Sequence, residues 1–533
     1  MTLPLTRPPR GGAGHDARPR PSPRPPWWPG RSRLWRDRAR QWPEQARRWP
    51  EQARRWQERN PLSRAWATSP RGAALLLAVC ALFAGAVAVF STNPPEQLWG
   101  IMAAGPYGLA ALAALLAGRR GRRIAVAVSL AGAVIVPLTW MAWTGRAQPE
   151  VGVVIHSAGL FLHDGTPYQA AHTLATAHNP YVYNPYLPAL AVFGLPHALF
   201  GGGLLTDPRL WFGVVFALGF AGTLALSGVR RPWLWTAVVT ASPLIAFPLT
   251  TGGDDLPVLA LICIGLALLR TSQAPRPVLR IIAAGLVLGL AAAMKATAWP
   301  ALAVALALVA ARDGKRAAGW LALATIAVPV AVDGPVLITQ PAAVVSNTIL
   351  FPLGLTKIKS PAASFLPGHL IAEAWGPGHL VAIGLVLLAG LGVAASLVLR
   401  PPRDERAAGW RLVTGLVLMF AFAPASRFGY VVYPLGLACW LLLAAPAASA
   451  PAPSGAARRQ LPVLPVSSGG DAESPGPISA LSAASSLSTP AAVPASSSSV
   501  WMSSVSPPTS SSTPDASSSS TAPARACIWA ILS

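Results

Sequence analysis

The sequence predicts an all-α polytopic membrane protein, a bundle of about 12 transmembrane helices with a long extracytoplasmic loop that bears interfacial helices. The first observation is composition: 53% of the 533 residues are hydrophobic, 11% are charged, and the mean hydropathy is +0.47. The second is order, because Leu, Ala and Val gather in runs close to the ~20 residues that cross a bilayer. The formal charge of +23 lies in a tail and in short loops. No nucleic-acid-binding motif accompanies it, so we expect no nucleic-acid partner.

The apolar segments define a predicted transmembrane domain of residues 71–446. They lie near residues 72–90, 101–118, 124–144, 208–228, 232–250, 254–270, 278–294, 299–312, 317–337, 377–399, 409–425 and 429–446. The segment of residues 187–205 is also apolar, but its prolines and its Gly201–Gly203 run argue against an ordinary crossing. We therefore expect it to lie at the outer interface or to re-enter the membrane.

Both termini are predicted to be disordered tails. Residues 1–70 are rich in Arg and Pro, and residues 447–533 are rich in Ser, Pro and Ala. Within the first tail, tryptophans recur every seven residues at Trp35, Trp42, Trp49 and Trp56. This repeat has two interpretations: an amphipathic segment at the lipid interface, or a duplicated low-complexity tail interrupted by proline.

The distribution of basic residues orients the chain in the cell membrane. Arg and Lys are frequent in the tail of residues 1–70 and in alternate short loops, such as Arg119–Arg123 and Arg312–Arg316. Cytoplasmic loops carry such an excess, so we expect both termini in the cytoplasm and the loop of residues 145–207 outside. The few outer cations are Arg146, Arg209, Lys295, Lys357, Lys359 and Arg427.

Acids and a cation are expected to converge at the outer ends of separate helices. Glu150 follows the third segment, Asp254 and Asp255 form the turn between the fifth and the sixth, and Lys295 ends the seventh. A membrane enzyme could pair a general base with a phosphate anchor in this way. A polar loop as long as residues 145–207 is itself uncommon between helices, and such loops usually bind or catalyse.

The sequence offers no metal-binding motif. His156 and His163 are seven residues apart and would share a helix face, with His172 and His178 nearby. No compact spacing such as His-Glu-x-x-His accompanies them, so no metal site is predicted and a divalent metal stays unsupported. The four cysteines show no disulfide or metal spacing.

The order of the outer motifs resembles glycosyltransferase family 87, the polyprenol-phosphate-mannose-dependent mannosyltransferases of the GT-C superfamily. The resemblance covers roughly residues 70–446 and implies that the predicted helices form a GT-C-like bundle. Its motifs are Glu150, Ala158, Gly165-Thr166-Pro167-Tyr168, Tyr183-Asn184-Pro185-Tyr186-Leu187-Pro188, Gly252-Gly253-Asp254-Asp255, and Lys295 with Pro300. The chain departs from the family in having Glu150 in place of Asp, Asn-Pro-Tyr in place of a double proline, and Asp-Asp in place of an amide-bearing turn.

The resemblance implies a glycosyltransferase that moves a sugar, mannose in the family, from a polyprenyl-phosphate donor to an extracytoplasmic cell-envelope glycan, lipid or protein. Glu150 is the expected catalytic base, and Asp164 is a second candidate. Lys295 is the first candidate for the donor phosphate and Arg427 the second. The expected substrate-binding residues are Asp254, Asp255, Tyr168, Tyr183 and Asn184. The lipid-linked sugar is a co-substrate, so no resident cofactor or soluble nucleotide is expected.

Simpler interpretations remain for each of these residues. Glu150 is also explained as a hydrated loop acid and Asp164 as a turn residue. Lys295 and Arg427 are also explained as cations that reach the lipid headgroups, and the tyrosines as an interfacial belt. The competing class of function is a transporter or a non-catalytic membrane scaffold, which would tolerate the loss of Glu150 and Lys295.

Overall fold

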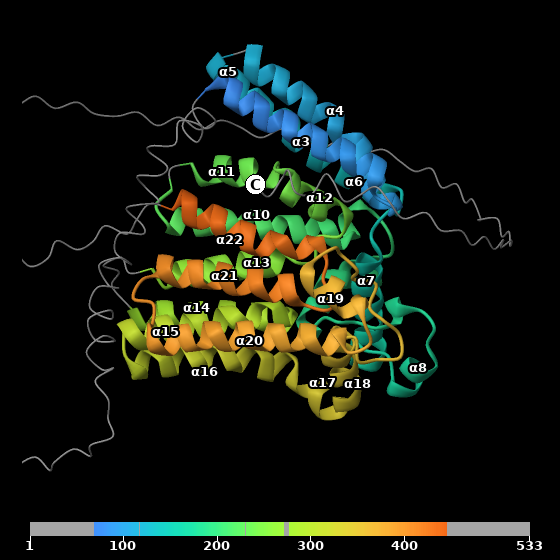
Figure 1. Cartoon of the computed structure of the whole chain (residues 1–533), viewed down its shortest axis with the longest axis vertical. Helices are drawn as coiled ribbons and strands as arrows, with labels where there is room; N and C mark the ends of the chain where they lie inside the picture. Colours follow the sequence, from blue (N-terminus) through green and yellow to red (C-terminus); the bar gives the residue numbers. More distant parts are fainter. Residues whose placement is uncertain (1–68, 117, 230, 271–276, 445–533) are drawn as a thin grey trace, which may run out of the picture. The chain divides into compact units, whose positions relative to one another are not determined.

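The computed structural model describes residues 69–116, 118–229, 231–270 and 277–444, and these residues are almost entirely helical (Figure 1). Among them the sole β-type pairing is an isolated bridge between Ala363 and Ser426. The predicted all-α fold class is therefore confirmed. The expected tails, with the tryptophan repeat, lie outside the described residues apart from Ser69 and Pro70.

Each of the twelve predicted segments corresponds to a helix or to consecutive helices. These are α3 (Pro70–Phe90), α4 (Pro94–Leu116), α5 (Gly118–Leu130) with η1 (Ala131–Ile135) and α6 (Val136–Trp143), α10 (Pro208–Leu226), α11 (Pro232–Thr240) with α12 (Pro243–Thr251), α13 (Leu256–Leu268), α14 (Pro277–Met294), α15 (Trp299–Arg312), α16 (Lys315–Val332), α20 (Gly378–Leu399), α21 (Glu405–Phe422) and α22 (Val432–Leu443). Six of the described spans are long and apolar enough to cross a membrane, and a bent pair makes a seventh.

The bent pair shows how the sequence breaks a helix inside the bundle. Helices α11 and α12 meet at an angle of 71° where Pro243 follows Ser242. A break of this kind frees backbone carbonyls that lipid cannot satisfy. Here the Tyr107 hydroxyl donates a hydrogen bond of 2.7 Å to the carbonyl of Ala241. The break is thereby stabilised by a neighbouring helix, α4.

Proline also limits the ninth predicted segment. The sequence predicts it over residues 317–337, but α16 ends at Val332 and a new short helix, α17 (Gly334–Thr339), begins. Gly334 and Pro335 stand at this junction, and proline is disfavoured inside a helix because it lacks an N–H and clashes with the preceding turn. The prediction was too long by this one turn.

Small residues allow the central helices to approach one another closely. A Cβ atom added at Gly289 of α14 would lie 2.4 Å from the Thr325 carbonyl oxygen of α16. A Cβ added at Gly219 of α10 would lie 2.9 Å from the Cβ of Ala260 in α13. Lipid gives helices little hydrophobic reason to associate, so such close van der Waals contact is a main source of packing energy.

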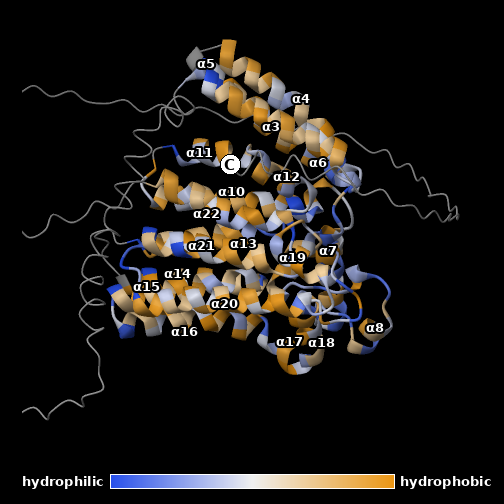
Figure 2. Cartoon of the chain, in the orientation of Figure 1, coloured by the Kyte–Doolittle hydropathy of each residue, from blue (hydrophilic) through white to orange (hydrophobic). Residues whose placement is uncertain are grey.

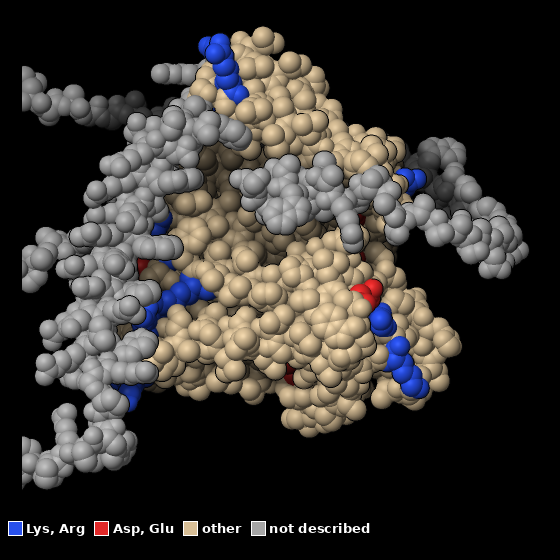
Figure 3. Space-filling view, viewed as in Figure 1, with Lys and Arg blue, Asp and Glu red and all other residues tan. Residues whose placement is uncertain are grey.

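The short helices gather at one end of the bundle, which we call the loop end (Figure 1). Its elements are α7 (Pro149–Asp164), α8 (Ala171–Thr176), η2 (Pro180–Val182), η3 (Pro188–Gly194), α9 (Leu195–Phe200), η4 (Leu204–Thr206), η5 (Ala296–Ala298), α17, α18 (Pro341–Val345), η6 (Ser346–Leu350), α19 (Pro367–Ala374) and η7 (Phe428–Val431). The long helices are mostly hydrophobic along their length (Figure 2). Charged side chains lie mainly toward the two ends (Figure 3).

The segment of residues 187–205, which the sequence predicts as interfacial or re-entrant, forms no single long helix. It consists of the 3₁₀-helix η3, the six-residue helix α9 and the short turn η4. Its first part is buried at the loop end, where the Leu187 N–H donates to the Met294 carbonyl at 3.0 Å.

Candidate active site

Two groups of charged side chains meet at the loop end, and each draws on helices far apart in sequence. Glu150 lies in the first turn of α7, and Arg427 immediately precedes η7. Asp254 and Asp255 form the turn between α12 and α13, and Lys295 follows the last residue of α14. The predicted convergence of acids and cations at one end of the bundle is present.

Two glycines shape the turn that carries the aspartates. Gly253 has φ +82°, a left-handed conformation that L side chains rarely adopt. A Cβ added at Gly252 would lie 2.6 Å from the Gln148 Oε1 atom. The pair therefore permits a sharp reversal after α12 and a close approach by the segment that precedes α7.

The lysine cluster consists of Lys295, Asp254 and Asp255, all buried. The Lys295 Nζ atom lies 2.8 Å from Asp254 Oδ2 and 2.5 Å from Asp255 Oδ1, and 4.6 Å from the centre of the Tyr186 ring. The Tyr433 hydroxyl donates to Asp255 Oδ1 at 3.0 Å. Burial opposes the charged ammonium, but the two carboxylates outweigh it and raise the pKa of Lys295. With both acids ionised, the cluster carries one excess negative charge.

The second group is an ion pair between Glu150 and Arg427. The Arg427 Nη1 atom contacts Glu150 Oε1, and the exposed fractions of the two side chains are 30% and 11%. Both carboxylate oxygens of Glu150 are buried, and no hydrogen bond to either is found among the described residues. Burial lowers the pKa of the Arg427 guanidinium, while Tyr430 and Glu96 oppose that shift. This pair has no excess charge, and its cation is the more exposed partner.

Two polar residues beside this pair were not predicted as site residues. Gln148 donates from Nε2 to Glu96 Oε1 at 2.8 Å. Glu96 lies in the first turn of α4. Its relation to Glu150 depends on the packing of α4 against the chain before α7, which no local pattern reveals. Tyr433 was missed too, although it lies six residues after Arg427 in a tyrosine-rich stretch.

Asp164, the second candidate catalytic acid, does not join either group. It is exposed and ends α7, fourteen residues after Glu150. At 1.5 Å per residue the two acids are about 21 Å apart along the helix. Its place next to Gly165 at the helix end agrees with the alternative interpretation as a turn residue.

The predicted substrate-binding residues of the long loop are engaged by the protein itself. Tyr168 is buried and donates from its hydroxyl to the Tyr186 carbonyl at 2.8 Å. The Asn184 side chain forms hydrogen bonds within the loop. Its Nδ2 donates to the Pro167 carbonyl at 3.2 Å, and its Oδ1 accepts from the Tyr186 N–H at 3.0 Å. The Tyr183 ring stacks on a phenylalanine ring with centroids 4.5 Å apart. These contacts hold the loop in place next to Lys295, whose Nζ atom lies close to the Tyr186 ring.

The described residues contain no group of three or more His, Cys, Asp or Glu side chains that could hold a metal ion. His156 is paired with Gln169, whose Nε2 lies 2.7 Å from the histidine Nε2. His163, His172 and His178 are exposed.

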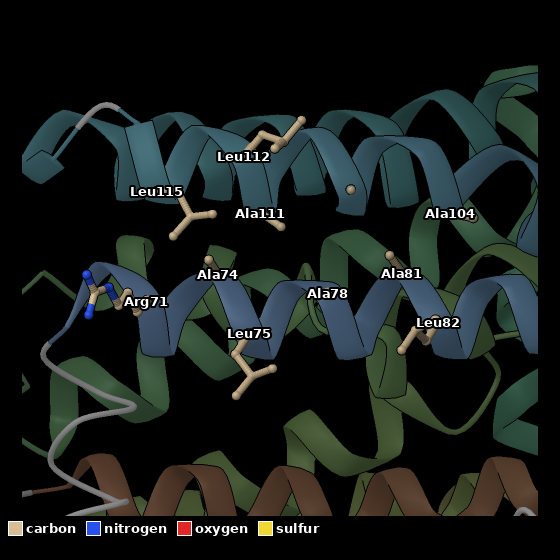
Figure 4. A pocket seen from close by; sticks show the side chains of 11 residues that line it. Arg71, Ala74, Leu75, Ala78, Ala81, Leu82, Ala104, Ala111, Leu112 and Leu115 are labelled. Atoms are coloured by element: carbon tan, nitrogen blue, oxygen red, sulfur yellow. The ribbon is translucent and has the colours of Figure 1, made fainter.

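A shallow groove lies away from both charged groups, on the hairpin of α3 and α4 (Figure 4). Its volume is about 670 Å³. Alanines and leucines line it, and Arg71 stands at one end. It contains none of the acids or cations discussed above.

The part of the chain that carries the lysine cluster matches a known family. Residues 181–424 match the model of glycosyltransferase family 87. These residues make up a little under half of the chain, and over them it is similar to this family. The match includes Asp254, Asp255 and Lys295, whereas Glu150 precedes it and Arg427 lies just beyond its end. The resemblance inferred from the motifs is thus confirmed over residues 181–424.

No curated protein matches the chain. Among solved structures it is similar to that of ArnT from Cupriavidus metallidurans in the apo state, with a TM-score of 0.39 and 17% identity. The similarity covers 61% of this chain and 59% of that one, which is less than two thirds of the length of ArnT.

Proposed function

We propose that the protein transfers a sugar, mannose by family resemblance, from a polyprenyl-phosphate donor to an extracytoplasmic acceptor of the cell envelope. The observation that carries this proposal is the Glu150–Arg427 pair. It brings together a buried carboxylate and a partly exposed guanidinium at the loop end of a family 87 chain. A general base and a phosphate-binding cation are the two groups that such a transfer needs.

Charge balance makes Arg427 a better phosphate anchor than Lys295. Lys295 already lies between two carboxylates, so a phosphate near it would meet one excess negative charge. Two like unit charges about 5 Å apart repel by about 3 kcal/mol at an effective dielectric constant of 20. Arg427 faces one carboxylate, is more exposed, and presents a planar guanidinium suited to phosphate oxygens. We therefore reverse the order of candidates that the sequence suggested.

The surface beside Arg427 suits a lipid tail. Phe428, Gly429 and Val431, which follow Arg427 directly, line a small apolar crevice with Phe83 of α3 and Phe247 of α12. The polyprenyl chain is apolar and its phosphate is anionic, so a cation at the edge of an apolar membrane-facing surface matches both parts of the donor.

The reaction is a displacement at the anomeric carbon of the sugar. The acceptor hydroxyl oxygen forms the new bond to this carbon, and its proton passes to the Glu150 carboxylate. The bond from the anomeric carbon to the phosphate oxygen breaks, and polyprenyl phosphate leaves with the electron pair, which Arg427 stabilises. Donor phosphate competes with Glu150 for Arg427, so donor binding would release the carboxylate that serves as base.

The lysine cluster has a different proposed role. Asp254 and Asp255 are candidates to orient sugar hydroxyls, while Lys295 keeps the two carboxylates together. Three residues of the long loop are proposed to hold it next to the lysine cluster through contacts with Tyr186 and its neighbours, and so to affect substrate binding indirectly. They are Tyr168, Tyr183 and Asn184.

The proposal places the loop end outside the cell and both termini in the cytoplasm. Thr206 lies in η4 at the loop end and is half-buried. A cysteine at this position should react with a membrane-impermeant maleimide added to intact cells. Labelling only after permeabilisation would contradict the orientation.

The function is tested by mass spectrometry of envelope lipids, polysaccharides and glycoproteins. A deletion strain would be complemented with the wild-type chain, with Glu150→Gln, or with the surface control Glu373→Gln, at matched protein levels. We expect one sugar-bearing species to disappear on deletion and to return with the wild type and the control alone. An unchanged envelope in every strain would instead favour a transporter or a scaffold.

A further inference from the structure

The chain immediately before Glu150 is held from two sides at Gln148. The Gln148 N–H donates to the Thr251 carbonyl at the end of α12, at 2.8 Å. Its side chain donates to Glu96 Oε1 of α4, also at 2.8 Å. Gln148 is therefore hydrogen-bonded to two helices, α4 and α12, that are distant from each other in sequence.

Gln148 is the N-cap residue of α7, and Glu150 stands two positions later in the first turn. Pro149 between them has a fixed φ, so little freedom separates the held residue from the carboxylate. No hydrogen bond to the Glu150 carboxylate oxygens is found among the described residues, although Arg427 contacts one of them. The position of its carboxylate thus depends on Arg427 and on where α7 begins.

The Glu96 carboxylate is itself fixed by its own helix end. The Ser91 hydroxyl donates to Oε2 at 2.7 Å, and the Asn93 side chain donates to Oε1 at 3.2 Å. Glu96 therefore offers Gln148 an acceptor that is already oriented. The helix hairpin that carries it, α3 and α4, precedes the residues that match the family.

We infer that Glu96 and Gln148 are positioning residues, which together form a clamp that holds the Glu150 carboxylate against Arg427. The inference rests on the proposed function, because it assigns to the clamp the placement of the catalytic base. It also gives the α3–α4 hairpin a part in the active site. Misplacing a reacting group by about 1 Å can reduce a rate by about 100-fold, so a clamp of two hydrogen bonds is consequential.

A direct catalytic role for Glu96 makes a different prediction. As a clamp, Glu96 needs only an acceptor oxygen, which Glu96→Gln retains. As a base, it needs a carboxylate, so Glu96→Gln would be as inactive as Glu96→Ala. The conservative substitution therefore separates the two roles.

The test measures sugar transfer by purified full-length protein in lipid vesicles, with polyprenyl-phosphate mannose as donor and solubilised envelope lipids as acceptor. We expect Gln148→Ala and Glu96→Ala each to lower kcat by about 10- to 100-fold, with donor KM changed less than about threefold. Glu96→Gln should recover kcat to within about fivefold of wild type, because its amide oxygen still accepts the hydrogen bond. The double alanine variant should be no worse than the poorer single variant.

Two kinetic outcomes overturn the clamp. One is an unchanged kcat in both alanine variants, even if their melting temperatures fall. The other is a Glu96→Gln variant as inactive as Glu96→Ala. Glu373→Gln, an exposed acid on α19 at the same end, is the matched control.

A readout that needs no activity keeps the clamp separate from the proposed function. Modification of Glu150 by an apolar carbodiimide, followed by peptide mass spectrometry, reports how well the buried carboxylate is held. We expect Gln148→Ala to speed this modification several-fold and Glu373→Gln to leave it unchanged. If the wild type transfers no sugar yet Gln148→Ala still speeds modification, the clamp stands and the proposed function fails. Equal modification rates in wild type and Gln148→Ala overturn the clamp.

Discussion

The Glu150–Arg427 pair and the lysine cluster lie at the same end of the bundle but differ in charge balance and in exposure. The first joins one acid to one cation, and its guanidinium is 30% exposed. The second joins two acids to one cation, and its ammonium is 5% exposed. A cation that is already outnumbered by buried acids is a poor receptor for another anion, whereas an accessible cation with one acid can exchange that acid for phosphate.

The two groups also differ in the roles that we propose for them, which are catalysis for the Glu150–Arg427 pair and structural support for the lysine cluster. The lysine cluster is anchored by Tyr433, whose hydroxyl in turn accepts a hydrogen bond of 2.9 Å from Thr297. Glu150 has no comparable set of donors among the described residues. We therefore propose that the catalytic base belongs to the first group and that the second group supports the structure.

The largest expected effect is at Glu150. Glu150→Gln keeps the shape of the side chain but cannot take a proton, so kcat for sugar transfer should fall by about 10²- to 10⁴-fold. Glu150→Asp, which restores the residue type of the family, should retain measurable activity. Glu373→Gln is the control. A Glu150→Gln enzyme with more than a tenth of wild-type kcat would remove Glu150 from the role of base.

The second largest effect is expected from a substitution at Arg427. Arg427→Ala removes the proposed phosphate contact and leaves Glu150 buried without its cation, so kcat/KM for the polyprenyl-phosphate donor should fall by about 100-fold. Arg146→Ala removes an exposed cation at the same end and should change kcat/KM by less than twofold. Equal kinetics for Arg427→Ala and wild type would show that the donor is bound elsewhere.

Lys295→Met should act mainly on stability. It leaves two buried carboxylates without a cation, and removing one partner of a buried ion pair costs about 3–5 kcal/mol. Adding Asp255→Asn should recover part of the loss, because one of the two acids is then neutral. Thermal unfolding in detergent measures both, with Lys359→Met as the exposed control. A fully stable Lys295→Met protein would contradict the structural role.

A smaller effect concerns Asp333, an acid that has no ion pair with a cation among the described residues. Burial raises the pKa of Asp333 to about 7, although the Ala189 N–H opposes the shift. The unfolded chain ionises this acid near pH 4, so the folded state should lose stability as pH rises from about 4 to about 7. Because the side chain is only half-buried, solvent screening reduces the loss to about 1–2 kcal/mol.

Asp333→Asn should therefore stabilise the protein at pH 7.5 and have little effect at pH 4. Melting temperatures of the two proteins, compared across this range, measure the difference. A constant difference at all pH values would show that Asp333 ionises normally.

The long helices and the convergence of charges were predictable from sequence because both follow local rules. Runs of apolar residues define helices that cross the membrane, and acids at their ends must stay hydrated or paired. Asp254, Asp255 and Lys295 all lie at such ends, so the lysine cluster could be expected. Proline and glycine also marked residues 187–205 as a segment that forms no single long helix, and the structure divides it into η3, α9 and η4.

The relations between particular side chains could not be predicted because they depend on tertiary packing. Local sequence does not show that Glu150 meets Arg427, which lies 277 positions later, rather than Lys295. It also does not show that Tyr168 and Asn184, which are predicted to bind substrate, form hydrogen bonds within the loop. The sequence also gives no reason to expect that Glu96 influences the position of Glu150, because the two acids are linked through Gln148.

The most direct test of the contrast between the two groups is the binding of polyprenyl phosphate, without sugar, to purified variants in lipid vesicles. We predict weaker binding by at least tenfold in Arg427→Ala and tighter binding in Glu150→Gln, in which Arg427 is released from its acid. The pair of substitutions Lys295→Met and Asp255→Asn keeps the net charge of its cluster and should change the affinity by less than about threefold. Loss of binding in this last variant together with unchanged binding in Arg427→Ala would contradict the account.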